Sequence, residues 1–285
     1  MRRVFLQLIC LTVAANTVAQ SKMCVHQKDG STVTFDVNDI VEINFTKSDS
    51  KSFVVNGVSF NMIRVDAGSF TMGAMEGDEY GVGFNETPHK VTLTKDFYLA
   101  ETECTQELWN AVMESNPSRF KGDDKPVDHL EWEDAKAFVE KLNEITGEQF
   151  RLPTEAEWEF AARGGNKSKG YLYAGSDSLG DVAWYVHNAV LDYSLPGYGT
   201  HPVATKQPNE LGLYDMSGNV WEWCEDTFLF YTDEEQTDPI VTDGYPYVFK
   251  GGGWDFMPYY CRNSHHYFPG NRHYDVGLRL CLTCD

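Results

Sequence analysis

The sequence lacks the long apolar run that a membrane-spanning helix needs. Its first apolar stretch, residues 4–15, follows arginines at 2–3 and leads into the small residues 17–19. A basic start, a short apolar stretch and small residues at a cleavage site are typical of a secretory signal peptide, whereas a spanning helix needs about 20 apolar residues. We therefore expect residues 1–19 to be removed. The mature protein would be exported, periplasmic or extracellular, with no integral membrane segment.

Basic residues are also scarce. The chain has 23 Lys and Arg against 43 Asp and Glu, which gives a formal net charge of −20. Most of such a surface repels a polyanion, so nucleic acid is excluded as a partner. The acidity instead indicates solubility and an affinity for cations. With 285 residues, 42% of them hydrophobic and 14% aromatic, the chain can still bury a sizeable core.

Cysteine is sparse, and six cysteines remain after removal of residues 1–19: Cys24, Cys104, Cys224, Cys261, Cys281 and Cys284. Neither Cys10 nor Cys24 lies in a sequence typical of lipid attachment. An even count in an oxidising compartment predicts disulfides, but six cysteines allow fifteen pairings and the sequence does not choose among them. Cys281 and Cys284 form a C-x-x-C pair at the C-terminus. We expect them to form a terminal disulfide or to pair with Cys24, Cys224 or Cys261.

Residues 20–57 predict a small β element ahead of a main domain at residues 58–285. Apolar residues alternate with polar ones along 32–37, and a turn sequence at 28–31 separates that stretch from residues 23–26. This order is typical of strand, turn and strand. The element has too few apolar residues for a core of its own, so we expect it to pack on the main domain or on another chain.

The main domain mixes short strands with a few helices. Alternation at residues 90–94, continued at 97–99, predicts strands. Apolar spacing and capping residues predict helices at residues 105–113, 132–146 and 154–163. Beyond these, Gly, Pro, Asn and Asp are frequent and the helical period disappears. The pattern therefore predicts an α+β fold with short strands, two or three helices and extensive structured loops.

Four segments are much more specific than this pattern. They are RLPTEAEWE at 151–159, NELGLYDMSGNVWEW at 209–223, GGGW at 251–254 and VGLR at 276–279. In this order they resemble the formylglycine-generating enzyme (sulfatase-modifying factor) family, including its exported bacterial members, over about residues 63–280. The resemblance implies a C-type-lectin-like α+β fold, but a fold does not fix a function.

The central motif also carries candidate metal ligands. Asp215 and Glu222 supply carboxylates, and the turn between them can direct carbonyl groups inward; such hard oxygen ligands suit calcium. The resemblance implies a calcium site at Asp215, Gly218, Val220 and Glu222. The alternative is that both carboxylates cap turns or face solvent.

The oxidase chemistry of the family is where the sequence departs from the pattern. The resemblance implies copper(I) held by two cysteine thiolates, which are soft enough to select that ion. Those two positions correspond here to Phe256 and Cys261, and the serine expected in the GGGW segment is Gly253. Because Phe256 cannot ligate a metal, copper is not expected and Cys261 is left as a single catalytic candidate. A related branch that uses iron needs a preceding helical bundle, for which residues 20–57 have no room.

Residues 254–274 are rich in aromatic rings with polar tips. Such rings give binding loops a large contact area at low entropic cost. We expect a surface groove formed by Trp254, Asp255, Tyr259, Tyr260, His265, His266, Tyr267 and His273. The alternative is that about half of these are ordinary core residues. The histidines follow no metal-ligand spacing.

Three functions stay open at this point. The first is an exported domain without oxidase activity, stabilised by calcium, that binds a peptide, glycan or protein. The second is an active formylglycine-generating oxidase that acts on a sulfatase cysteine and uses a rearranged thiol pair. The third is a lectin-fold display protein with a diversified C-terminal loop. Phe256 favours the first, while the ligand and the oligomeric state stay open.

Overall fold

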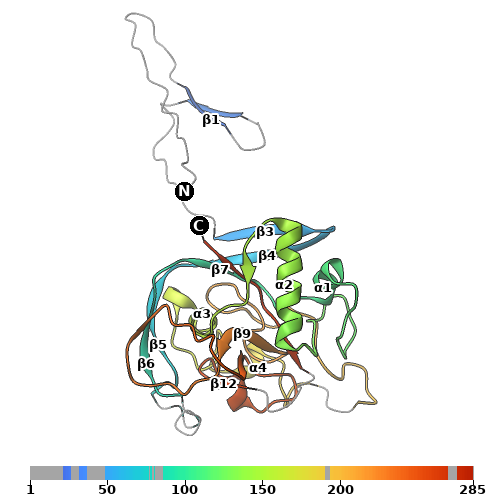
Figure 1. Ribbon diagram of the computed structural model, residues 1–285, viewed down its shortest axis with the longest axis vertical. Coiled ribbons are helices and arrows are strands. Elements are labelled where there is room, and N and C mark those ends of the chain that lie inside the picture. The colour runs from blue at the N-terminus through green and yellow to red at the C-terminus, as the bar shows by residue number, and fades with distance from the viewer. Residues whose placement is uncertain are drawn as a thin grey trace, which may run out of the picture. The chain divides into compact units, whose positions relative to one another are not determined.

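The computed structural model describes residues 22–26, 32–36, 49–76, 78, 80, 86–189, 193–268 and 275–284. The chain divides into two units, residues 1–47 and residues 48–285 (Figure 1). The expected signal peptide at residues 1–19 lies outside the described residues, and so does His273.

The first unit contains two of the predicted strands. β1 (Lys22–His26) and β2 (Thr32–Asp36) pair antiparallel, with Cys24 opposite Thr34. The second unit begins earlier than expected, because β3 (Ser50–Val55) is part of its main sheet.

The second unit contains short strands and helices in the following order: β3 (Ser50–Val55), β4 (Val58–Val65), β5 (Gly68–Met72), β6 (His89–Leu93), β7 (Phe97–Ala100), α1 (Gln106–Val112), α2 (Trp132–Thr146), β8 (Phe150–Arg151), α3 (Glu155–Ala162), η3 (Gly165–Lys167), α4 (Leu179–Val182), β9 (Trp221–Thr227), β10 (Gln236–Thr237), β11 (Tyr247–Lys250), η4 (Pro258–Cys261), β12 (His266–Tyr267), β13 (Val276–Gly277) and β14 (Cys281–Thr283). The three predicted helices are confirmed. Thr105 caps α1, and Thr154 and Glu157 form the predicted capping box of α3. The short helix α4 was not predicted, because four residues carry no helical period.

The largest sheet has five strands in the order β3-β4-β7-β14-β8, and the neighbouring helices α1 and α2 pack against it (Figure 1). Side chains on β7 alternate between two cores, as the pleat of a strand requires. Tyr98 packs into the cluster that contains Trp109 and Phe138. Leu99 packs into the second cluster, which contains Trp158 of α3. The strand β7 is therefore buried on both faces.

The remaining strands form a four-stranded sheet, β12-β11-β9-β13, and a three-stranded sheet, β10-β6-β5. In the four-stranded sheet Glu222 on β9 lies opposite Lys250 of β11 and Gly277 of β13. The sheet thereby brings the central motif, the residue that precedes the GGGW motif and the last motif together at Glu222. The mixture of short strands, few helices and long loops confirms the predicted α+β class.

The cysteines contradict the disulfide prediction. Cys104, Cys224, Cys261 and Cys281 are free thiols, and each is at most 3% exposed. The predicted terminal disulfide between Cys281 and Cys284 is therefore wrong. Cys281 lies on β14, which pairs with β7 and β8, and its side chain is buried in the second core cluster. Burial raises the pKa of all four thiols, which keeps them protonated and unreactive.

In the part of the chain that the structure describes, no helix combines the length and the apolar character that crossing a membrane requires.

Candidate functional site

Glu222 is the point where the family motifs meet. Its carboxylate accepts a bidentate pair of hydrogen bonds from Arg279, with Nη2 at 2.7 Å from Oε1 and Nε at 2.9 Å from Oε2. Trp158 on α3 donates its indole N–H to Oε2 at 2.6 Å. All three side chains are fully buried. Three motifs that are far apart in sequence are thus joined by one ion pair and one indole hydrogen bond.

The two carboxylates among the four predicted calcium ligands differ in the oxygens that they leave free for an ion. Glu222 accepts two hydrogen bonds at each oxygen, which is the full capacity of a carboxylate. Asp215 retains one buried oxygen, Oδ1, without a hydrogen-bond partner among the described residues, while its Oδ2 accepts from the backbone of Ala204 at 2.7 Å. No group of three or more His, Cys, Asp or Glu in the described chain is arranged to hold a metal ion. Calcium binding stays a prediction.

A third buried carboxyl group, which sequence reasoning missed, lies beside this centre. Glu103 is 1% exposed and accepts hydrogen bonds from the Val220 backbone at 3.0 Å and from Asn219 at 2.6 Å. Burial, reinforced by Asp215 and Glu222, raises the pKa of Glu103 well above its usual value. Glu103 therefore holds the turn of the central motif. Only its place in the fold reveals this, because it lies more than 100 residues upstream of that motif.

The two copper positions do not form a thiolate pair. Cys261 is fully buried among Tyr173, Leu179, Val182 and Ala183, a cluster that supplies no second sulfur. Phe256 is half-buried, and its ring lies 5.2 Å from that of Trp221. The backbone of Gly252 covers Cys261, since a Cβ at that glycine would lie 2.7 Å from the Cys261 sulfur. Cys261 is consequently neither paired with a cysteine nor accessible as a ligand.

The glycine at position 253 is also explained by its surroundings. A Cβ there would lie 2.2 Å from Oδ2 of Asp275, so the serine of the family pattern does not fit without moving that carboxyl group. Asp275 is 5% exposed. Burial, and then the neighbouring Asp255, raise its pKa well above the usual value. The space beside Gly253 is therefore occupied by the buried carboxyl group of Asp275.

Part of the predicted binding groove is buried, which corrects the sequence interpretation. Trp254, His265 and His266 are at most 4% exposed, so they do not line an open groove. His265 contacts Glu86 at 2.9 Å, and burial lowers its pKa to about 4. His266 lies 2.8 Å from Glu155. These residues are core residues, as the alternative interpretation stated.

The accessible part of the same segment forms a continuous row of rings. Adjacent ring centroids lie 4.2 to 5.9 Å apart. We call this row the aromatic array: Tyr80, Phe256, Tyr259, Tyr260, Tyr267 and Phe268. Its two ends are the most exposed, with Tyr80 at 49% and Phe268 at 37%, and Asp255 is exposed next to Phe256. The predicted groove included three of these rings, Tyr259, Tyr260 and Tyr267, but not Tyr80, which reaches the segment from a distant loop.

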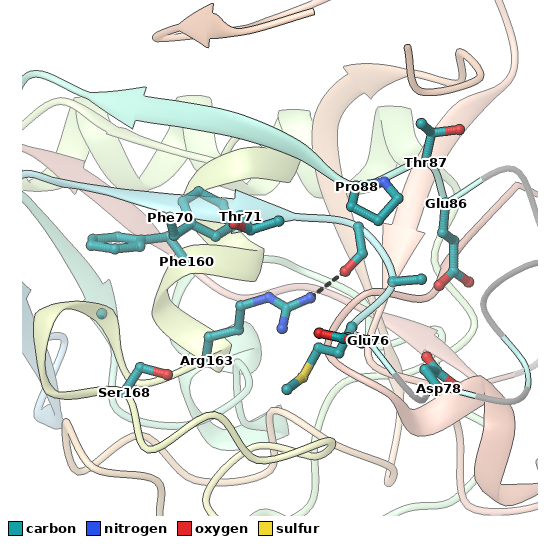
Figure 2. Close-up of a pocket in the computed structure, with 14 residues that line it drawn as sticks. Phe70, Thr71, Glu76, Asp78, Glu86, Thr87, Pro88, Phe160, Arg163 and Ser168 are labelled. Carbon is teal, nitrogen blue, oxygen red and sulfur yellow. Dashed lines mark hydrogen bonds between the residues drawn. The ribbon is translucent and has the colours of Figure 1, made fainter. Parts of the chain in front are cut away.

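A cavity of about 820 Å³ lies between β5 and the end of α3. Figure 2 shows Phe70 and Phe160 on one side of it, the carboxylates of Asp78 and Glu86 on another, and Arg163 between them. Sequence reasoning gave no sign of this cavity, because its lining comes from three separate segments.

Comparisons with known proteins agree with this architecture. The family model described as sulfatase-modifying factor enzyme 1-like domain matches residues 49–284. The chaperone protein LppX of Paenibacillus barcinonensis is 34% identical over 223 residues, which cover 63% of this chain and 77% of that protein. The formylglycine-generating enzyme of Streptomyces coelicolor is 35% identical over 144 residues, which cover 48% of this chain and only 44% of the enzyme.

Among solved structures, variable protein 1 of Treponema denticola superimposes with a TM-score of 0.73 at 30% identity. The match covers 84% of this chain and all of that one. The extent of the family match, together with these relatives, shows that the chain belongs to the sulfatase-modifying factor enzyme 1-like family.

Proposed function

We propose that this chain is an exported member of the family that does not oxidise cysteine and instead binds a peptide or protein through the aromatic array. One observation carries the proposal. Phe256 stands where the family pattern has a thiolate, and its ring lies 5.1 Å from that of Tyr260 in the array. The same substitution therefore removes a metal ligand and extends a binding surface.

Loss of the oxidase follows from ligand chemistry. Copper(I) needs two soft ligands to be held firmly, and the only thiolate candidate, Cys261, is buried with a raised pKa. A protonated thiol in an apolar cluster binds a metal poorly.

Ligand binding is supported by the composition and exposure of the array. Tyrosine and phenylalanine rings supply large, rigid contact area with few rotatable bonds. The half-exposed rings of the array lie side by side, so a ligand can contact several at once. A protein or peptide is the favoured ligand because one relative is named a chaperone, and because interface cores are enriched in aromatic residues.

The direct test of the first half of this proposal is an oxidase assay. The purified chain is incubated with a cysteine-containing sulfatase-motif peptide, copper, reductant and oxygen, and an aldehyde probe with mass confirmation reads the product. We expect no aldehyde. Turnover that disappears in Cys261→Ala would overturn the proposal and establish an active formylglycine-generating oxidase.

A gain-of-function variant sharpens that assay. Phe256→Cys restores one sulfur while Cys261 stays buried, so we expect copper(I) to bind the variant weakly and the parent not detectably. Turnover should stay absent, because Gly253 and the buried Asp275 still differ from the family pattern. A parent protein that already binds copper(I) as tightly as the variant would contradict the ligand argument.

Binding is tested with a random peptide library displayed on phage. We expect enrichment of peptides on the parent protein and its loss in the combined Tyr259→Ala and Tyr260→Ala variant. The control combines Val54→Ala and Ile145→Ala, two apolar residues that are 68% and 48% exposed outside the array. Enrichment that survives the tyrosine changes, or that the control also removes, would refute binding at the array.

A display protein with a diversified loop is the second candidate. It is favoured by the similarity to a structure named a variable protein and by the position of five array rings within residues 254–268. Sequencing this gene in many isolates decides the matter: variation confined to this segment supports display, and a uniform segment excludes it.

Export itself is tested by N-terminal sequencing of the mature protein, which should begin after residue 19.

A further inference from the structure

The cavity between β5 and α3 has the size and the walls of a small-molecule site. Its volume of about 820 Å³ falls within the usual range of ligand pockets, which is roughly 300–1,000 Å³. Phe70 and Phe160 form one wall, with their rings 5.2 Å apart, and Met75 and Pro88 add further apolar surface. A ligand for this cavity therefore needs an apolar body.

Arg163 presents an unused edge of its guanidinium group to the cavity. The side chain is only 10% exposed. Its Nε and Nη2 donate to Glu159 at 2.9 and 2.7 Å, and Nη2 also donates to the Gly73 carbonyl at 2.6 Å (Figure 2). Its Nη1 makes no hydrogen bond to any residue that the structure describes. Glu159 fixes the orientation of the guanidinium, because it is itself held by Lys250 at 2.9 Å. The free Nη1 edge is thus a positioned donor for a carboxylate.

The carboxylates around the cavity are not equivalent. Glu86 accepts a bidentate pair from Arg262, at 2.8 Å to each oxygen, and Asp78 also bonds Arg262. Against the effect of burial, the hydrogen bonds from His265 and Arg262 lower the pKa of Glu86 to about 2. Glu76 lines the same cavity, is exposed, and makes no ion pair with a described basic residue. Glu76 is therefore the carboxylate available to a ligand.

We propose that this cavity binds a small zwitterion of the α-amino-acid class with an apolar or aromatic side chain. The carboxylate of the ligand pairs with Nη1 of Arg163, the ammonium group pairs with Glu76, and the side chain lies along Phe70 and Phe160. A ligand with only a carboxylate would be repelled by Glu76 and would have no positive charge to offset that repulsion. A ligand with only an ammonium group would leave the guanidinium edge unpaired. The lining of this cavity contains no residue of the aromatic array, and the proposal does not depend on the function proposed above.

Four related compounds dissect the recognition. L-Phenylalanine carries both charges, 3-phenylpropionate only the carboxylate, phenethylamine only the ammonium group, and N-acetylphenylalanine amide neither. Isothermal titration calorimetry with the full chain measures each affinity. We expect saturable binding of L-phenylalanine, in the millimolar range or tighter, and binding about tenfold weaker or more for each of the other three. No saturable binding of L-phenylalanine, or equal binding of the uncharged compound, would overturn the proposal.

Two variants test the location of the site. Glu76→Gln should weaken L-phenylalanine about tenfold without weakening 3-phenylpropionate, since only the ammonium group loses its partner. Ser168→Trp should abolish binding of every compound, because Ser168 lines the cavity and a large ring there fills it. Lys167→Trp is the matched control, as Lys167 is exposed on the same short helix outside the lining. Thermal melting of each variant establishes that it is folded. Folded variants that bind L-phenylalanine like the parent would refute this site.

Discussion

The Glu222 centre, which consists of Glu222, Arg279 and Trp158, differs from the aromatic array in burial, charge and hydrogen bonding. Both include residues of the four-stranded sheet. The centre is buried, charged and fully hydrogen-bonded, and its partners come from the segments that carry the family resemblance. The array is half-exposed and aromatic, and it includes Phe256, where the chain departs from the family pattern.

The difference separates what maintains the fold from what contacts a ligand. A buried ion pair cannot lose one partner without leaving an uncompensated charge, so such a centre tolerates little change. Exposed rings can be exchanged at small cost to the fold. Chemistry on this fold can therefore be lost or replaced while the architecture persists, which is how the absence of a thiolate pair coexists with an intact Glu222 centre.

The largest expected effect comes from breaking the centre. Glu222→Gln leaves the fully buried Arg279 without its charged partner, so we expect the free energy of unfolding to fall by about 3–5 kcal/mol. Denaturant unfolding followed by circular dichroism measures the loss. The control is Glu235→Gln, which breaks an exposed pair with Lys90 at 3.2 Å and should cost less than about 1 kcal/mol. Equal losses for the two variants would mean that the centre does not support the fold.

The next effect concerns the unpaired oxygen of Asp215 and depends on pH. Burial raises the pKa of Asp215 from 3.8 to about 6. A carboxyl group with a raised pKa in the folded state binds its proton more tightly there, so the free energy of unfolding falls as pH rises from about 4 to 6 and stays lower above that. Two pKa units correspond to about 2–3 kcal/mol. Asp215→Asn should therefore raise stability at pH 7.5 by up to about 2 kcal/mol and flatten this part of the pH profile.

The same variant decides the calcium prediction. Because Glu222 has no oxygen capacity left, we expect neither calcium nor a chelator to move the melting temperature of the parent protein. A calcium-induced rise that Asp215→Asn abolishes would establish the predicted site, since a ligand that binds only the folded state raises stability by mass action. Asp123→Asn, at an exposed aspartate, is the control for the change of charge.

A smaller effect on stability is expected when Gly253 is replaced by the serine of the family pattern. Gly253→Ser places a Cβ against the Asp275 carboxyl group, so we expect a loss of about 1–3 kcal/mol in the free energy of unfolding. Combining it with Asp275→Ala should recover part of that loss, as expected of two residues in contact. Gly180→Ala, a site with open space around it, should be close to neutral. An unchanged stability in Gly253→Ser would show that the space beside Asp275 accepts the serine of the family pattern.

The sequence predicts the local features of this protein, such as helix caps and strands, but not the contacts between residues that are far apart in the chain. Helix caps such as Thr154 and the alternating strand at β6 follow from short-range rules, and the structure agrees. Glu103 and Tyr80 could not be found in this way, because each joins its site from more than 100 residues away. Burial of His265 and His266 was missed for a related reason. An aromatic segment has the same composition whether its polar tips face solvent or carboxylates such as Glu86.

The smallest expected effect is at the end of the aromatic array. Tyr80→Ala removes a ring that is 49% exposed and stacks on Tyr259 at 5.7 Å, so we expect the free energy of unfolding to fall by no more than about 1 kcal/mol. Tyr193→Ala, at a tyrosine that is 83% exposed, should change stability still less. The comparison that matters is with Trp221→Ala. That ring is fully buried beneath Phe256 and Phe249, and its loss should cost about 3–5 kcal/mol. If Tyr80→Ala destabilised the chain as much as Trp221→Ala, the array would be part of the structural core. Its exposed rings would then no longer be available as a binding surface.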